Sequence, residues 1–355
     1  MKKVKTGSLA VACSYIGAVV GAGFISGQEI VQFFVQFGAL GIVGLLITIF
    51  IIIFGGAYVL SALSKINLKS FSDLTERLFN EKMRSIVNLL INGYLIGGLI
   101  IMISGAGVIL AEILSVNLLL GTILTSLLIY LTVVGKVKRL LLVNKLLVPI
   151  LVSSIMMVAI QILKGTSFEI SKAFPIAYRS PLLRNWWQSV ILYVGYNFIG
   201  VIVALMNIVG SVSRKQGVVG GVVGGLVIAF LTVLIFLVLW NTFPGWRGTN
   251  LPIVSEIKRH SSLMYRWFTP TIWIAMFTTA IAYALGVSKY IYKKFKFSLK
   301  IVCFFLLLVI LPITQLGFTR LVGLIYPFFG IAVVLVLLQM IARRGWETMK
   351  PIKTA

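Results

Sequence analysis

The stretch VVGAGFISGQEI, Val19 to Ile30, places three glycines, a serine, a glutamine and a glutamate inside a segment that is otherwise apolar. Each glycine destabilises a helix interior by about 1 kcal/mol relative to alanine. An unwound turn inside a bilayer leaves peptide N–H and C=O groups unpaired unless they face protein, water or a ligand. We therefore predict that the helix breaks at Gly21–Phe24, and that the break forms part of a binding site.

The composition of the whole chain is that of a membrane protein. Of its 355 residues, 59% are hydrophobic and 11% are charged, and the mean hydropathy is +1.07. Soluble domains carry about 25% charged residues. Apolar runs of the ~20 residues that a spanning helix needs recur along the chain. They are too long and continuous for the alternating strands of a barrel, so an all-α polytopic protein is predicted.

Hydropathy predicts a single transmembrane domain of ten helices. The ten apolar segments cover about 8–37, 39–63, 85–115, 117–135, 139–163, 186–210, 217–243, 266–288, 297–317 and 319–342.

The net charge of +24 comes from 32 Lys and Arg against 8 Asp and Glu. In a soluble protein such a charge indicates nucleic acid as a partner. Here the basic residues alternate between the two sides of the predicted spans, with 23 on one side and 9 on the other. The positive-inside rule explains this division and predicts that both termini are cytoplasmic. We expect the lipid bilayer, and no nucleic acid, as a partner.

Enzyme chemistry is not indicated by the sequence. Cys13 and Cys303 are the only cysteines and His260 is the only histidine, so no metal cluster or disulfide framework is expected. No paired aspartates or nucleophile elbow occur. GAGFISG is similar to a dinucleotide-binding loop, but no strand precedes it. The lipobox-like end of MKKVKTGSLAVAC follows too short an apolar run for cleavage, so we expect an uncleaved first helix.

A second interruption is predicted in the sixth segment, at YVGYNF, Tyr193 to Phe198. It lies five helices after the first, and its segment crosses in the opposite direction. Broken helices at corresponding positions of two halves are the best sequence indication of a transporter site. We therefore predict a 5+5 inverted repeat, with repeats over about 8–163 and 186–342.

The predicted breaks are suited to a small zwitterion or anion, with or without a sodium ion or a proton. Freed carbonyl groups can coordinate a cation, and the N-terminus of the next half-helix can hold a carboxylate. The alternative is close helix packing, because Gly17 and Gly21 form a G-x-x-x-G pair. Packing does not explain Ser26, Gln28 and Glu29, which follow.

Two acids lie well inside predicted spans, and such residues are usually functional. Glu29 has three possible roles: a proton carrier, a member of a structural hydrogen-bond network, or a gate near the external interface. Glu112 lies near the external end of its segment, which favours a solvated or gating role.

Other polar groups in the spans have both a functional and a structural interpretation. Tyr193, Tyr196 and Asn197 either line a pocket against the first segment or join helices together. Thr278 and Thr279 either contribute oxygens to a cation site or bond back to the preceding turn, where Ala275 lies. The glycine-rich stretch 217–225 is interpreted as a helix-packing face without chemistry.

The string GAGFISGQEI and the ten-span, five-plus-five pattern resemble the YkvI-type bacterial membrane proteins. More distantly, they resemble branched-chain amino acid carriers and spore-germination permease subunits. The architecture is similar to the LeuT-type fold of the amino acid–polyamine–cation superfamily over nearly the whole chain. This resemblance implies a bacterial plasma membrane location.

The resemblance also implies site residues. A sodium site would lie between the first and eighth helices, and a solute site at the two breaks; a proton-coupled carrier would have a basic residue such as Lys145 nearby. The implied sodium-site residues are Gly17, Val20, Ala275, Thr278 and Thr279, and the implied solute-site residues are Ala22, Gly23, Phe24, Ser26, Tyr193, Gly195, Tyr196 and Asn197. YVGYNF departs from the glycine-rich sixth-helix break of amino acid permeases.

Two functions are compatible with the sequence. The first is a secondary transporter of a small amino-acid-like solute, coupled to sodium or to protons, in which helices one, two, six and seven rock against the rest. The second is a sensor or receptor subunit that binds a solute without transporting it, as the germination relatives imply. No cofactor is expected beyond Na⁺ as a possible coupling ion, and the sequence identifies no protein partner.

Overall fold

The computed structural model describes residues 7–65, 76, 80–135, 140–164, 179–209 and 212–342, and within these residues every regular element is a helix. The first apolar segment contains α1 (Ser8–Val19), α2 (Ala22–Ile25), α3 (Gln28–Phe33) and the 3-10 turn η1 (Val35–Phe37). The longer helices and one short one follow: α4 (Ala39–Lys65), α6 (Glu81–Leu114), α7 (Leu118–Val134), α8 (Leu140–Leu163), α9 (Trp186–Val209), α10 (Arg214–Thr242), α11 (Pro252–His260), α12 (Ser262–Phe295), α13 (Leu299–Thr314) and α14 (Phe318–Ala342).

Several helices have the length and composition to cross a bilayer. Among the described residues five qualify, within α4, α6, α10, α12 and α14, and shorter apolar helices form α1, α7, α13 and much of α8. Large apolar side chains such as Phe50 and Phe54 of α4 and Val309 of α13 are exposed on the outside of the bundle. In lipid this surface needs no further cover. The chain is therefore a multi-pass helical membrane protein.

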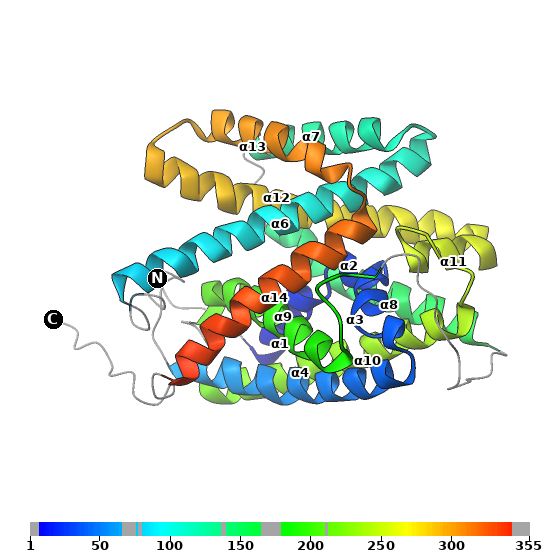
Figure 1. Cartoon of the computed structure of the whole chain (residues 1–355), viewed down its shortest axis with the longest axis horizontal. Coiled ribbons are helices and arrows are strands. Elements are labelled where there is room, and N and C mark those ends of the chain that lie inside the picture. The colour runs from blue at the N-terminus through cyan, green and yellow to red at the C-terminus, as the bar shows by residue number, and fades with distance from the viewer. Residues whose placement is uncertain are drawn as a thin grey trace.

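The helices are arranged in a bundle in which sequence-distant elements lie side by side. Figure 1 shows α7 and α13 together along one edge, with α4 and α10 along the opposite edge. Direct contacts join α4 to α10, α6 to α12, α7 to α13 and α1 to α9, and α14 packs along α9. The helices of the first segment are thereby enclosed between the two edges.

Local capping positions several helix starts. Asn80 accepts a hydrogen bond from the backbone N–H of Met83 at the start of α6, and Asn117 does the same for Leu120 in α7. Ser213 and Gln216 form a reciprocal capping box at the start of α10. These side chains satisfy backbone donors that the first turn of a helix leaves unpaired.

The glycines of α10 form the packing face that the sequence predicts. A Cβ at Gly221 would lie 2.5 Å from the Cα of Ala57 in α4, and one at Gly220 would lie 2.6 Å from the Cβ of Val11 in α1. Only glycine allows the backbones to approach so closely. The interpretation of 217–225 as a packing face is confirmed.

The predicted break in the sixth segment is wrong. Helix α9 runs without interruption through Tyr193–Phe198. Gly195 instead allows α9 to approach α14, because a Cβ there would lie 2.9 Å from Val334 Cγ2 and 3.0 Å from the carbonyl oxygen of Gly330. The Asn197 side-chain amide donates to the Tyr193 carbonyl at 2.9 Å, so it is satisfied within its own helix.

Some predictions fall outside the described residues. The positions of the two chain termini and the side chain of Lys145 belong to this group, as does the side chain of Ala22.

We expect Gly221→Ala to destabilise the protein, because the added methyl group would collide with the backbone of α4. Overpacking of this kind costs about 1–3 kcal/mol. The measurement is the thermal unfolding midpoint of the purified protein in detergent. Val223→Leu, at an exposed position of the same helix, is the control and should leave the midpoint unchanged. An unaltered midpoint in Gly221→Ala would contradict the close contact.

Candidate functional site

The first segment loses its helical hydrogen bonding immediately after Val19. The N–H of Val20 still bonds to Ile16 O at 2.7 Å, but the N–H of Gly21 turns back to Val19 O at 2.8 Å. In a continuous helix the N–H of Gly21 would bond to Gly17 O. The Gly17 carbonyl therefore lacks its usual donor at this turn.

A second break follows α2, at Ser26 and Gly27. Gly27 has φ +81°, a left-handed conformation that favours glycine. The Ser26 hydroxyl donates to Gly23 O at 2.8 Å and accepts from the N–H of Gln28 at 3.3 Å. The Ser26 carbonyl accepts from the N–H of Ile253, in α11, at 3.0 Å. These contacts satisfy backbone groups that the break would otherwise leave unpaired.

Glu29 lies in the first turn of α3 and is only 3% exposed. The Tyr196 hydroxyl, from α9, donates a hydrogen bond to Glu29 Oε2. Gly23 lies against the same carboxyl group, since a Cβ there would lie 2.3 Å from Oε1. Among the described residues no cation forms an ion pair with Glu29. The Tyr196 phenol is therefore the hydrogen-bond donor to this acid among the described side chains.

Tyr196, which bonds to Glu29, belongs to a group of packed aromatic rings. The ring of Tyr196 stacks on that of Tyr326, from α14, with centroids 4.6 Å apart and planes 1° apart. The ring of Tyr193 packs edge-on against those of Phe33 and Phe34, with ring centroids 5.1 Å and 5.0 Å apart. We call Phe33, Phe34, Tyr193, Tyr196 and Tyr326 the aromatic cluster. Tyr326 is not among the site residues predicted from the sequence, although a phenol within a predicted span is a signal of a polar contact.

Contacts join four of the eight predicted solute-site residues around Glu29, and these residues are closely packed: Gly23, Ser26, Tyr193 and Tyr196. Phe24, Ser26 and Tyr193 are fully buried, and Gly23, Gly195, Tyr196 and Asn197 are buried as well. Helix α3, which carries Glu29, contacts both α2 and α9. Gly195 faces α14 rather than the first segment, and Asn197 bonds within α9.

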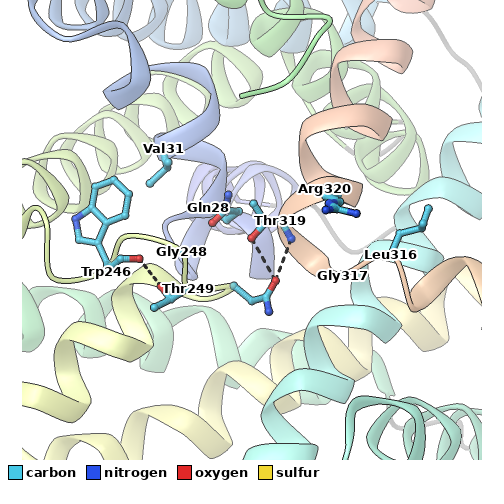
Figure 2. Close-up of a pocket in the computed structure, with 10 residues that line it drawn as sticks. Gln28, Val31, Trp246, Gly248, Thr249, Leu316, Gly317, Thr319 and Arg320 are labelled. Carbon is cyan, nitrogen blue, oxygen red and sulfur yellow. Dashed lines mark hydrogen bonds between the residues drawn. The ribbon is translucent and has the colours of Figure 1, made fainter. Parts of the chain in front are cut away.

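A cavity of about 290 Å³ lies next to this region, at the start of α3. Figure 2 shows side chains from α3, from the stretch 246–250 and from the start of α14 around it. Of the predicted solute-site residues none lines it. The residues that do are Gln28, Val31, Trp246, Gly248, Thr249, Asn250, Leu316, Gly317, Thr319 and Arg320. We call this space the outer cavity.

The predicted sodium ligands have the oxygen chemistry that a hard cation needs. Thr278 and Thr279 hydroxyls both donate to Ala275 O, at 3.2 Å and 2.8 Å, so their lone pairs remain available. Helix α12, which carries them, packs against α2 beside the first break. Gly17 is exposed and faces Val148 of α8. The hydroxyl oxygens of α12 are therefore ligands of the kind that sodium binds.

Glu112 lies apart from Glu29, in a surface ion pair that holds α11. Its carboxylate accepts from Lys258 Nζ at 2.6 Å, and Lys258 also lies over the ring of Tyr265. The hydrogen bond to Glu112 raises the pKa of Lys258.

Glu256 of α11 is buried, which raises its pKa, and Arg259 and His260 oppose that shift. Through Ile253, the same helix α11 reaches the carbonyl of Ser26.

Comparison with known proteins identifies relatives and a fold. The chain is 27% identical over 332 residues to the "Uncharacterized membrane protein YkvI" of Bacillus subtilis (strain 168), covering 93% of this chain and 94% of that protein. It is 26% identical over 317 residues to the "Uncharacterized protein YyaD" of the same organism, covering 89% and 90%. No protein-family model matches.

Solved structures of transporters have the same fold. MhsT in complex with L-phenylalanine aligns with a TM-score of 0.60 at 19% identity, covering 94% of this chain and 87% of that chain. Mhp1, a nucleobase-cation-symport-1 family transporter, aligns in a closed conformation with bromovinylhydantoin bound, with a TM-score of 0.55 at 15% identity and coverage of 96% and 78%. Its inward-facing conformation gives 0.54 at 15% identity, covering 95% and 73%. The all-helical architecture is therefore that of LeuT-fold transporters.

We expect Tyr196→Phe to lower the free energy of unfolding, because it leaves the Glu29 carboxyl group buried without its donor. A buried polar group without a partner costs about 1–3 kcal/mol. The measurement is the thermal unfolding midpoint in detergent. Tyr58→Phe, at an exposed position of α4, serves as the control for removal of a hydroxyl group. Equal midpoints for the two variants would show that the Tyr196–Glu29 contact contributes nothing.

Proposed function

We propose that the protein is a secondary transporter that moves a small amino-acid-like solute across the bacterial plasma membrane by alternating access. The observation that supports this most strongly is the break in the first segment, with a buried carboxylate beside it, inside a transporter fold. Mhp1 is known in both closed and inward-facing conformations, and MhsT in complex with L-phenylalanine.

Alternating access in such folds uses two repeats that move against each other. The contacts of α1 with α9, α4 with α10, α6 with α12 and α7 with α13 join equivalent members of the two proposed repeats, 8–163 and 186–342. These pairings support a five-plus-five arrangement of ten spans. The distribution of basic residues supports cytoplasmic termini.

The proposed central site lies between α2, α3 and α9, around Glu29. Because the aromatic cluster fills this space, a solute enters only when α9 separates from α3. That movement breaks the hydrogen bond between Tyr196 and Glu29. A solute ammonium group can then replace the phenol as donor to Glu29, with the greater strength of a charge-assisted hydrogen bond.

The proposed coupling ion is sodium, bound by oxygens of the first break and of α12. The carbonyl of Gly17, released at the break, and the hydroxyls of Thr278 and Thr279 are its candidate ligands. A cation there would favour the broken form of the first segment, because it satisfies a carbonyl group that the helix does not. Solute and sodium binding would therefore be linked.

We expect the purified protein, reconstituted in liposomes with an inward sodium gradient, to accumulate a member of a radiolabelled amino acid panel. Replacing sodium with choline should reduce the accumulation. Glu29→Gln should abolish it, because the neutral amide cannot pair with the solute ammonium group. Absence of accumulation across the panel, under both a sodium and a proton gradient, would contradict transport. Binding to Glu29 without flux would identify a sensor instead.

Thr279→Ala should remove the sodium dependence of solute binding, because it deletes a proposed ligand. Thr271→Ala is a matched control: its hydroxyl bonds back to Trp267 O at 2.9 Å in the same helix, and the residue is half-buried. The measurement is solute affinity in sodium and in choline, by equilibrium dialysis. A sodium effect that survives in Thr279→Ala would reject this cation site.

A further inference from the structure

The outer cavity lies apart from the proposed central site, although the two are adjacent along α3. Glu29 faces Gly23 and Tyr196, whereas its neighbour Gln28 lines the outer cavity together with Thr319 and Arg320 of α14 (Figure 2). The volume of about 290 Å³ is at the lower end of the range for ligand pockets. The space can hold a small organic molecule.

Gln28 presents a buried polar group to this space. Gln28 is only 2% exposed, and its side-chain amide forms no hydrogen bond with any described residue. Its backbone N–H, by contrast, bonds to the Ser26 hydroxyl. The amide atoms of Gln28 are not among the fully enclosed polar atoms that lack a partner, so they are open to the cavity, where a ligand or water can satisfy them. The Gln28 amide can donate two hydrogen bonds to an acceptor in the cavity.

Arg320 supplies the cavity with a positive charge. In the described part of the chain its guanidinium forms no ion pair, and no acidic side chain lines the cavity. Arg320 belongs to the first turn of α14, a helix of 25 residues, so the positive end of the helix dipole adds to its charge. The fork of guanidinium donors matches the two oxygens of a carboxylate.

The remaining walls are suited to an apolar body next to the anionic group. Val31 and Leu316 line the cavity, and so does Trp246. The indole of Trp246 is held in place, because its Nε1–H donates to Leu239 O at 2.7 Å. The carbonyl oxygen of Trp246 accepts from the Thr249 hydroxyl, and the Asn250 side-chain oxygen accepts from Thr319. The loop that forms this wall is therefore fixed by hydrogen bonds within itself and to α10 and α14.

We propose that the outer cavity is a second binding site, specific for the carboxylate of a small organic acid with an apolar body. Arg320 binds the carboxylate, the Gln28 amide donates to the same group, and Trp246 packs against the apolar part. An amino group is not required, because no carboxylate in the lining would pair with it. The site goes beyond the proposed transport and does not depend on it.

The test uses three probes of one carbon skeleton: L-leucine, 4-methyl-2-oxopentanoate, which lacks the amino group, and 3-methylbutylamine, which lacks the carboxylate. Binding to the purified full-length chain in detergent is measured by quenching of Trp246 fluorescence, assigned by comparison with Trp246→Phe. The oxo acid should bind and the amine should not. Arg320→Gln should weaken binding of the oxo acid by about tenfold or more, the scale of a lost charge-assisted hydrogen bond.

Arg247→Gln is the matched control, because Arg247 is exposed in the same loop but does not line the cavity. It should bind the oxo acid like the unaltered protein. Gln28→Leu, similar in size, should also weaken binding, whereas Arg320→Lys should retain part of it. Equal binding of acid and amine, or unchanged affinity in both Arg320→Gln and Gln28→Leu, would overturn the proposal.

Failure of this proposal can be told apart from failure of transport. Binding of the oxo acid that depends on Arg320, in a protein that shows no flux in liposomes, would support the outer site and reject transport. Flux that depends on Glu29, together with an affinity for the oxo acid that Arg320→Gln leaves unchanged, would reject the outer site alone.

Discussion

The need to satisfy every peptide group inside a bilayer is the constraint on which this structure depends. Between Val19 and Gln28 the first segment gives up part of its helical hydrogen bonding, and the surrounding residues replace it. The Ser26 hydroxyl bonds to the carbonyl of Gly23, and the N–H of Ile253 bonds to the carbonyl of Ser26. The Tyr196 hydroxyl donates to the carboxyl group of Glu29, which follows the break. The break is therefore held by Ser26 within the segment and by contacts from two distant parts of the chain, α11 and α9.

The two halves of the chain contribute differently to the site. The first half contributes an opened backbone, whereas α9 remains continuous and contributes side chains, chiefly Tyr196. Helix α11 adds a connection from the surface, since Lys258 bonds to Glu112 and Ile253 bonds to Ser26.

The sequence allowed the helical class and an interruption of the first segment to be predicted, because hydropathy and glycine content act locally. The predicted position, Gly21–Phe24, was only partly right, because Ala22–Phe24 lie in helix α2 and the chain breaks on either side of it, at Val20–Gly21 and Ser26–Gly27. The packing role of Gly217–Gly225 followed for the same reason. The continuity of α9 could not be predicted, because the sequence does not distinguish a glycine that interrupts a helix from one that allows another helix to pack closely against it. Whether Gly195 does one or the other depends on α14, about 135 residues away (Gly330). The partners of Glu29 and the outer cavity depend on long-range contacts in the same way.

The most direct test of the central claim is an electron cryo-microscopy structure of the protein in lipid nanodiscs. We expect density that leaves the helical path after Val19, forms the short helix α2 at Ala22–Ile25 and breaks again at Ser26–Gly27, with the Glu29 side chain facing Tyr196. A straight, unbroken helix from Ser8 to Phe33, with Glu29 turned away from α9, would contradict it.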